Sequence, residues 1–508
     1  MIRTAKVENG MVRGVSAADP RITAFLGVPF AAPPVGNLRW KAPQKAHDWD
    51  GVLDTYKFAP ISVQTTPGLS KTDIYTREWN VDPEIPMSED CLYLNIWTPA
   101  ANADERLPVF VWYFGGALQV GNTAEMEFNG ERIARRGIVV VTVNYRVNVF
   151  GFLAHPELTA ENPDFPTNFG NLDQKFGTEW VKKNIKAFGG DPDNITIGGQ
   201  SAGGGSVMTQ LASPLTKGLF QKAIVQSGSR LGAFPGSRPE RAQDLAAAEK
   251  AGVEFLKVLG VKTLAEARAL DALFIRDKMV EHKTWWGTVA DGGDLPGNAM
   301  ELILKNQRHM VPLLMGHTSS EFMSSPASAS FGELEALAKE KFGGSAEEFL
   351  GLCKTGDIGE AVKKATFSPV ELSIRAIFSR SAMADKAGNN YYYIFDADIP
   401  GWDNPGTFHS VDIWFFFETL GVCWRPFVGR HYDLARKMCN YWANFIKTGN
   451  PNGADADGSP MPEWKPFTET QSPIIFRDKI EMGKQGSQSG LMKFLEDYYL
   501  KKDEQYRI

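Results

Sequence analysis

The sequence lacks several features that mark particular classes of protein. Its 508 residues include only four cysteines, which are widely spaced and predict neither a disulfide framework nor a metal site. No apolar run is long enough to span a bilayer. The first ten residues also lack the apolar core of a signal peptide. We therefore expect a cytoplasmic protein or, as the alternative, a secreted one whose signal peptide has been removed.

The charge gives no sign of a polyanionic partner. Lys and Arg number 54 and Asp and Glu 60, so the net charge is −6, and no block of basic residues is present. Nucleic acid and anionic membranes are therefore poor candidates as partners. Hydrophobic residues make up 43% and charged residues 22% of the chain, as in ordinary globular proteins. We predict a single domain over residues 1–508 that is a monomer or a homodimer.

One stretch carries a chemical signature, the sequence G-Q-S-A-G at 199–203. It follows an apolar run at 194–197 that is typical of a buried strand, and a helix is expected from Gly203 onward. Strand, tight turn and helix are the context of a nucleophile elbow, which exposes a serine hydroxyl on a strained turn. Gly199 and Gly203 would keep side chains out of that turn. By itself the motif also fits a glycine-rich turn that opens a helix.

Segments with strand and helix patterns alternate along much of the chain. This alternation predicts an α/β fold with a mostly parallel sheet and helices on both faces. The expected strands include 107–114, 137–145, 194–197, 222–227, 311–316 and 390–395, and helices are expected over 171–187, 431–447 and 489–501.

Three further regions do not follow this alternation. Residues 238–282 and 331–385 are mainly helical in pattern, and we predict that they are insertions that cover the C-terminal edge of the sheet. Open sheets of this kind bind their ligands at that edge. Residues 60–88 show little periodicity and are predicted to be a surface loop.

A serine hydroxyl becomes a nucleophile only with help. It needs a base within hydrogen-bond reach, usually a histidine, and a carboxylate that orients the base. In enzymes with this elbow the chain order is Ser, acid, His, so the base is expected after Ser201. The candidates are His282, His309, His317, His409 and His431.

Further motifs identify a family. The segment 88–97, with the sequence SEDCLYLNIW, resembles a signature of type-B carboxylesterases. Similar matches occur at 25–34, 168–174, 188–192, 226–229 and 442–451, so that the resemblance runs from Phe25 to about Phe467. It implies an α/β-hydrolase fold, with helical insertions over an active-site gorge. It also implies a serine carboxylesterase that forms an acyl-enzyme intermediate.

The resemblance implies three catalytic residues. Ser201 matches the family's nucleophile, Glu321 its acid and His409 its base. The residues alone leave two alternatives open. Asp412 lies close to His409 in the sequence and is a rival acid, and His317 lies close to Glu321 and is a rival base.

An oxyanion hole requires backbone donors aimed at the tetrahedral intermediate. The segment 114–118 resembles the family's glycine-rich oxyanion loop, and it implies the amides of Gly116, Ala117 and Ala202 as donors. Ala117 stands where many relatives have Gly, and Phe114 where many have His or Tyr. The amide of Ala117 can still donate, but its methyl group narrows the pocket.

Other matches imply structural roles. Arg39 and Glu89 match a structural ion pair, and Ser227 matches a serine near the acid, so a contact with Glu321 is expected. Cys91 matches a disulfide-bonded cysteine, but no upstream partner exists, which fits a reducing compartment. We predict no cofactor and no metal.

The predicted substrate is a small-molecule carboxylic ester. Trp79 lies roughly where cholinesterases hold a cation-binding tryptophan, but the neutral Gln200 stands where those enzymes have Glu, which argues against choline esters. The aromatic residues near the expected gorge favour aryl or short-to-medium acyl esters. The candidate substrate-binding residues are Gln200, Leu118, Trp285, Trp286 and Trp414.

Two other functions stay open at this point. A non-catalytic relative could use the fold for adhesion or binding, although such relatives typically lose a triad member. The same triad could also act on amides or carbamates.

Overall fold

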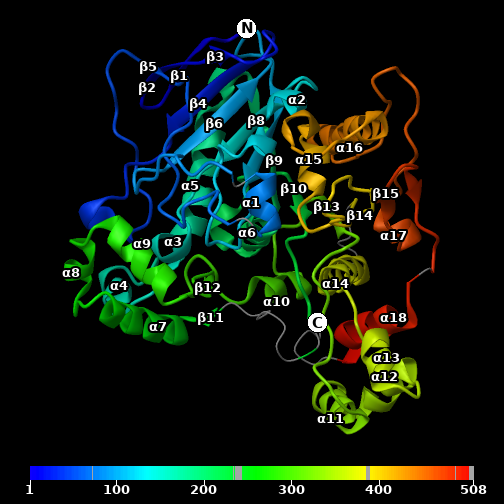
Figure 1. Ribbon diagram of the computed structural model, residues 1–508. Helices are drawn as coiled ribbons and strands as arrows, with labels where there is room; N and C mark the ends of the chain where they lie inside the picture. Colours follow the sequence, from blue (N-terminus) through cyan, green and yellow to red (C-terminus); the bar gives the residue numbers. More distant parts are fainter. Residues whose placement is uncertain are drawn as a thin grey trace.

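A large twisted sheet forms the centre of the molecule (Figure 1). The computed structural model describes residues 1–70, 72–79, 81–232, 234, 243–384, 389–486 and 488–502. Within these residues the sheet has 11 strands. In spatial order they are β16 (Glu481–Met482), β15 (Ile474–Phe476), β14 (Tyr391–Phe395), β13 (Leu313–Thr318), β10 (Lys222–Gln226), β9 (Gly190–Gln200), β7 (Leu107–Tyr113), β8 (Val139–Val143), β6 (Tyr93–Thr98), β4 (Thr23–Pro29) and β3 (Val15–Ser16).

The predicted mostly parallel sheet is confirmed. The strands from β15 through β8 in this order run parallel to one another. β16 and the three strands beyond β8 pair antiparallel. β8 has the sequence VVVTV and is buried along its whole length, as expected of a β-branched strand that is covered on both faces.

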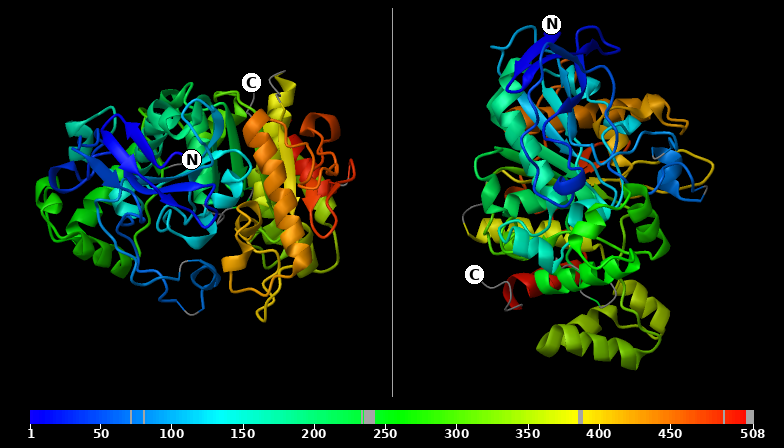
Figure 2. Two further views of the ribbon diagram at one scale, coloured as in Figure 1. Left: turned by 90° about the horizontal axis from the view of Figure 1, so that it is seen from above. Right: turned by 90° about the vertical axis from the view of Figure 1, so that its left-hand side faces the viewer.

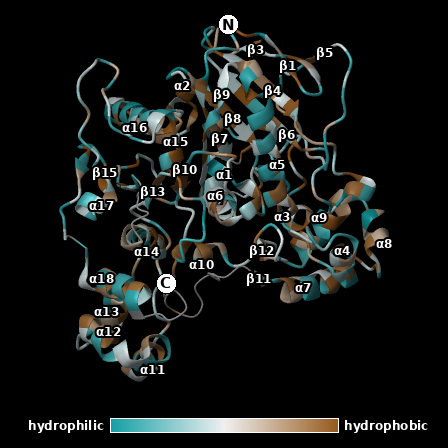
Figure 3. Cartoon of the chain, turned by 180° about the vertical axis from the view of Figure 1, so that it is seen from behind, coloured by the Kyte–Doolittle hydropathy of each residue, from teal (hydrophilic) through white to brown (hydrophobic). Residues whose placement is uncertain are grey.

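Helices flank the sheet (Figure 2). α5, α6, α14 and α16 pack against its strands. The long α16 carries both hydrophobic and hydrophilic residues (Figure 3), and its buried side chains include Met438, Trp442 and Phe445. The helices outside the two predicted insertions are α1 (Ile74–Glu78), α2 (Glu131–Ala134), α3 (Asn148–Phe152), α4 (Pro156–Glu161), α5 (Phe169–Asn184), α6 (Ala202–Ala212), α10 (Ala299–Leu304), α15 (Asp412–Phe416), α16 (Gly429–Thr448), α17 (Phe467–Thr470) and α18 (Gly490–Asp497).

The order of β7, β8 and β9 creates a switch point in the sheet. β8 follows β7 in the chain and pairs with one of its edges, whereas β9 pairs with the other. β7 and β9 are adjacent strands, and the loops that leave their carboxyl ends therefore run in opposite directions along the sheet. Such a point opens a crevice in which α/β proteins bind ligands.

The two predicted insertions are helical. The first holds α7 (Leu245–Val258), α8 (Leu264–Arg268) and α9 (Ala272–Glu281), and the second holds α11 (Phe331–Phe342), α12 (Ala346–Cys353), α13 (Ile358–Lys364) and α14 (Pro369–Met383). Residues 238–242 and 385 lie outside the described residues. α11 to α13 lie at the end of the molecule opposite the N-terminal strands (Figures 1 and 2), but α14 packs against β13. The role of either region as a cap stays a prediction.

The N-terminal part contains a smaller sheet. β1 (Thr4–Val7) and β2 (Gly10–Arg13) form an antiparallel hairpin, and β5 (Val52–Asp54) pairs parallel with β2. A short parallel pair, β11 (Gln243–Asp244) and β12 (Val289–Ala290), lies elsewhere in the chain. None of the described helices combines the length and the apolar character needed to cross a bilayer.

The predicted surface loop at 60–88 is wrong in part. This segment contains α1, and the side chains of Ile61, Val63, Gln64 and Glu78 are buried. The backbone of this segment is irregular. Hydrophobic periodicity reveals only regular helices and strands, so it did not indicate that these side chains are buried. All four cysteines are free thiols, so Cys91 forms no disulfide.

Candidate active site

The nucleophile elbow has the predicted strand–turn–helix form. β9 ends at Gln200 and α6 begins at Ala202, so that Ser201 stands alone between them with φ 54° and ψ −123°. Positive φ is strained for a residue with a side chain. A Cβ atom at Gly199 would lie 2.4 Å from the backbone of Gly203, and one at Gly203 would lie 2.1 Å from the carbonyl oxygen of Tyr113. Both glycines are therefore required by the close approach of the backbone.

Three side chains that are far apart in the sequence meet at the elbow. The Oγ atom of Ser201 lies 2.8 Å from Nε2 of His409, and Nδ1 of His409 lies 2.8 Å from Oε2 of Glu321. Ser320 and Phe408 pair in an isolated β-bridge, which holds the loops of the acid and the histidine side by side. The geometry is that of a base between a nucleophile and an orienting carboxylate.

Glu321 is buried and well supplied with donors. The hydroxyl of Ser227 donates to Oε1, as expected from the sequence, and so do the amide and the hydroxyl of Thr318, at 3.3 and 3.2 Å. Burial alone would raise the pKa of this carboxyl. The charge and hydrogen bond of His409, together with His317 and Ser227, outweigh that effect and lower the pKa to about 2. Glu321 is therefore ionised at neutral pH and can stabilise a positive imidazole.

The two rival residues have other partners. Nδ1 of His317 lies 2.8 Å from the carbonyl oxygen of Thr318, and Nε2 lies 2.9 Å from the hydroxyl of Tyr392. Asp412 accepts from the hydroxyl of Tyr393 at 2.7 Å and from Gln226 at 3.1 Å. Burial raises the pKa of Asp412. Among the hydrogen bonds of the described residues, His317 makes none with Ser201. Asp412 makes none with His409, so neither rival has the contact that its role would require.

The loop after β7 lies directly against the elbow. A Cβ atom at Gly115 would lie 3.0 Å from the carbonyl oxygen of Gln200 and 3.3 Å from Cβ of Ser201. The ring of Phe114 stacks on Tyr145 at 4.0 Å, and the Tyr145 hydroxyl donates to the Phe114 carbonyl at 2.7 Å. These contacts fix the start of the glycine-rich loop.

The three expected oxyanion donors have free amides. Gly116, Ala117 and Leu118 all have positive φ, at 107°, 58° and 62°. Among the hydrogen bonds of the described residues, none is donated by the amide of Gly116, Ala117 or Ala202. The amide of Ala202 is also the first of α6, where the helix dipole favours negative charge. Free donors beside the serine are what an oxyanion hole needs.

Ser201 opens into a cavity of about 310 Å³. Of the candidate substrate-binding residues, Gln200 and Trp285 line it, and Trp285 is 61% exposed. Trp79 also lies on the wall. The other lining residues include Gly115, Gly116, Ala117, Glu125, Glu127, Phe128, Arg230, Phe322, His409, Ser410 and Ile413.

The remaining candidates are not among the residues that line the cavity, and their role as substrate contacts stays a prediction. Trp286 packs against Phe255, and its backbone is bound by Gln119, which also donates to the carbonyl of Ala117. Trp414 is fully buried and donates to a carboxylate behind the wall. Leu118 is half-buried against the hydrophobic core.

Sequence reasoning missed two acidic residues of the cavity. Glu125 and Glu127 line it, and Glu127 has no exposed surface. They follow the oxyanion loop in a segment with no periodic pattern, where acids are usually solvated. The one available signal was their position, two acids just beyond a loop expected to face the substrate.

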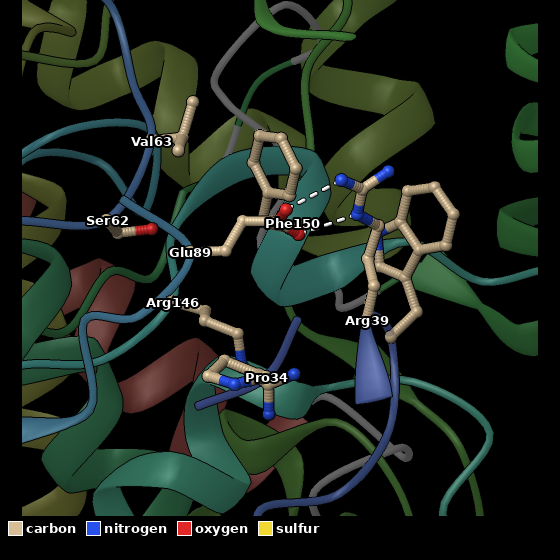
Figure 4. Close-up of a pocket in the computed structure, with 8 residues that line it drawn as sticks. Pro34, Arg39, Ser62, Val63, Glu89, Arg146 and Phe150 are labelled. Atoms are coloured by element: carbon tan, nitrogen blue, oxygen red, sulfur yellow. Dashed lines mark hydrogen bonds and ion pairs between the residues drawn. The ribbon is translucent and has the colours of Figure 1, made fainter. Parts of the chain in front are cut away.

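Arg39 and Glu89 form the expected ion pair (Figure 4). Nε and Nη2 of Arg39 donate to the two carboxylate oxygens, each at 2.6 Å. Nη1 donates to the carbonyls of Ala267 and Leu270, so that the pair connects the N-terminal part to the first helical insertion. Neither residue lies on the wall of the Ser201 cavity.

The sheet order, the switch point and the strand–serine–helix turn define the chain as an α/β-hydrolase. Comparison with known proteins gives the family, since residues 2–342 and 361–490 match the carboxylesterase family. The chain belongs to the carboxylesterase family and is a carboxylic ester hydrolase. The predicted fold class, family and enzyme class are thereby confirmed.

Individual relatives agree with this placement. The chain is 32% identical over 467 residues to para-nitrobenzyl esterase of Bacillus subtilis (strain 168), covering 87% of this chain and 89% of the relative. It is 30% identical over 509 residues to a cholinesterase of Mus musculus, covering 92% and 82%. A solved structure of a thermophilic PNB esterase superimposes with a TM-score of 0.77 at 27% identity, covering 97% of this chain and 100% of that chain.

Proposed function

We propose that this chain is a serine carboxylesterase in which Ser201 is the nucleophile, His409 the general base and Glu321 the orienting acid. The single observation that carries the proposal is the continuous contact from Ser201 through His409 to Glu321, at 2.8 Å in each step. His409 would take the serine proton as Ser201 attacks the ester carbonyl, and would return it to the leaving alcohol. Water would then release the acyl group by the same route.

The developing negative charge would be held by backbone donors. The amides of Gly116, Ala117 and Ala202 are assigned to this role, because they lie around Ser201 and donate to no other acceptor among the described residues. Each such donor typically contributes about 3 kcal/mol of transition-state stabilisation.

The cavity supports small esters with aryl or short-to-medium acyl groups. Its volume of about 310 Å³ is at the low end of ligand pockets. Gln200 and Trp285 are the substrate contacts that we retain, and Phe322 is a further aromatic side chain on the wall. The para-nitrobenzyl esterase relative motivates nitroaromatic esters as probes.

The test is hydrolysis of p-nitrophenyl acetate, butyrate and benzoate by the wild type and by Ser201→Ala. We expect turnover by the wild type and none above background by the variant, with the same circular dichroism spectrum. Ser410→Ala is the matched control, because Ser410 is the other serine on the cavity wall. Equal activity of wild type and Ser201→Ala would overturn the proposal.

A further inference from the structure

The cavity wall holds two carboxyl groups that have no cationic partner among the described residues. Glu127 has no exposed surface, and its carboxyl group hydrogen-bonds the side chain of Glu125, while no N–H or other hydroxyl group of the described residues donates to it. Its neighbour Glu125 is half-buried and, besides this contact, accepts from Asn122, through the backbone amide at 3.2 Å and the side chain at 3.4 Å. Neither acid forms an ion pair within the part of the chain that the structure describes.

Both acids are held at the same cavity as the nucleophile. They belong to the segment that follows the oxyanion loop, and Glu127 lies in the short helical turn Met126–Phe128. The hydroxyl of Thr419 donates to the carbonyl of Glu127 and anchors that turn. Glu125, Glu127 and Ser201 all line one cavity.

An unpaired buried carboxyl is costly, and two adjacent ones cannot both be ionised at low cost. Burial raises the pKa of Glu125 to about 7, partly offset by its contacts with Glu127 and Asn122. Burial, the charge of Glu125 and the charge of Glu78 raise the pKa of Glu127 well above its ordinary value. The pair therefore shares protons near neutral pH instead of carrying its full charge.

The charged residues nearby, within the described part of the chain, do not neutralise Glu125 or Glu127. Glu78 is fully buried behind the wall and is neutralised by Arg425 at 2.6 Å, which commits that guanidinium. Arg230 lies over the ring of Phe322, 5.2 Å from its centroid, and that ring packs against His409. The other titratable groups that line the cavity are Asp73, Tyr75 and His409.

We infer that Glu125 and Glu127 form a binding subsite for a protonated amine carried by the ester substrate. The inference rests on the serine esterase function proposed above. An ammonium group placed here would donate to the carboxyl oxygens of the pair and let it release a proton, which an uncharged group cannot do. The aromatic wall that includes Trp79 would exclude water from the contact. Cholinesterases have Glu at the position of the neutral Gln200. In this chain Glu125 and Glu127 would supply the negative charge instead.

Two esters of nearly the same shape test this subsite. Dimethylaminoethyl acetate carries a protonated amine at neutral pH, and isoamyl acetate has a carbon atom in place of the nitrogen. We expect the wild type to hydrolyse the amine ester with at least about tenfold higher kcat/KM, since a buried charge-assisted contact contributes that much or more.

The variants are Glu127→Gln and Glu125→Gln, which keep the shape of each side chain and remove its charge. Each should lose about tenfold in kcat/KM for the amine ester and change less than about twofold for isoamyl acetate. Glu84→Gln, at an exposed carboxylate away from the cavity wall, controls for net charge and should leave both rates unchanged. Glu127→Leu is the second variant if an amide is not tolerated.

Calorimetric titration with dimethylethylammonium chloride gives a readout that is independent of catalysis. We expect binding to the wild type and to Ser201→Ala, and none to Glu127→Gln. An amine preference that survives in both Gln variants, or equal rates for the two esters in the wild type, would overturn the subsite. Absence of both ester activities in the wild type, with ammonium binding intact, would instead count against the proposed triad.

Discussion

The side-chain amide of Gln200 contacts the imidazole nitrogen of His409 that faces the nucleophile. The side-chain Nε2 of Gln200 lies 3.3 Å from Nε2 of His409, the same ring atom that lies 2.8 Å from Oγ of Ser201. An amide nitrogen only donates, so Nε2 of His409 accepts and the ring proton is on Nδ1, facing Glu321. This is the tautomer that a general base next to a serine requires.

Replacement of Glu321 by Gln should lower kcat by roughly ten-thousand-fold, because an amide can stabilise neither the Nδ1–H tautomer nor the imidazolium. Asp412→Asn is the matched control, since Asp412 is also buried near His409 but hydrogen-bonds Tyr393 and Gln226. Its effect on kcat should be below about tenfold. Steady-state kinetics with p-nitrophenyl butyrate measures both. The reverse order of effects would make Asp412 the acid.

The low pKa of Glu321 predicts a loss of stability in acid. The pKa falls from 4.5 to about 2 on folding, so the stabilisation is present above about pH 4.5 and is lost as the pH falls toward 2. Its size is about 3 kcal/mol for a shift of this magnitude. Urea unfolding at a series of acidic pH values should show a shallower loss for Glu321→Gln than for the wild type. Parallel curves would contradict the assignment.

Glu125 and Glu127 in the cavity wall predict the opposite dependence of stability on pH. Because folding raises the pKa of Glu125 from 4.5 to about 7, its favourable contribution is present below about pH 4.5 and is lost as the pH rises through 7. Glu127→Gln removes the neighbouring carboxyl, so its free energy of unfolding should fall less than that of the wild type between about pH 5 and pH 8. The same urea series checks this. A steeper fall in the variant would rule out the shared proton.

Arg39→Met should lower the free energy of unfolding by about 3 kcal/mol, because it leaves Glu89 largely buried without its partner. The carbonyls of Ala267 and Leu270 also lose their donor. The double variant with Glu89→Leu should recover part of the loss, since no uncompensated charge remains. Urea unfolding measures both, and kcat of the folded enzyme should be little changed. A large drop in kcat at unchanged stability would give Arg39 a catalytic role.

The sequence predicts the central fold well because its signals are local. The β-branched run that becomes β8 and the glycines around Ser201 report on strand burial and on a tight turn within a few residues. The irregular segment at 60–88 was misjudged, because its burial comes from distant elements and leaves no period in the sequence.

The residues of the site likewise differ in how well the sequence predicts them. Ser201 can be found from its motif, but Glu321 and His409 lie far along the chain, and only the family resemblance favoured them over Asp412 and His317. Which aromatic residues face the cavity depends on packing: Trp285 lines the cavity, whereas its neighbour Trp286 packs against Phe255. The protonation of a buried carboxyl likewise depends on tertiary surroundings that the sequence does not display.

The most direct test of the proposed mechanism is the mass of the protein after reaction with diethyl p-nitrophenyl phosphate, a reagent that phosphorylates activated serines. We predict one diethylphosphoryl group per chain, mapped by peptide mass spectrometry to Ser201, with complete loss of esterase activity and no labelling of Ser201→Ala. Ser410→Ala should label like the wild type. Labelling at another residue, or full activity after Ser201 has been labelled quantitatively, would contradict the assignment of Ser201 as the nucleophile.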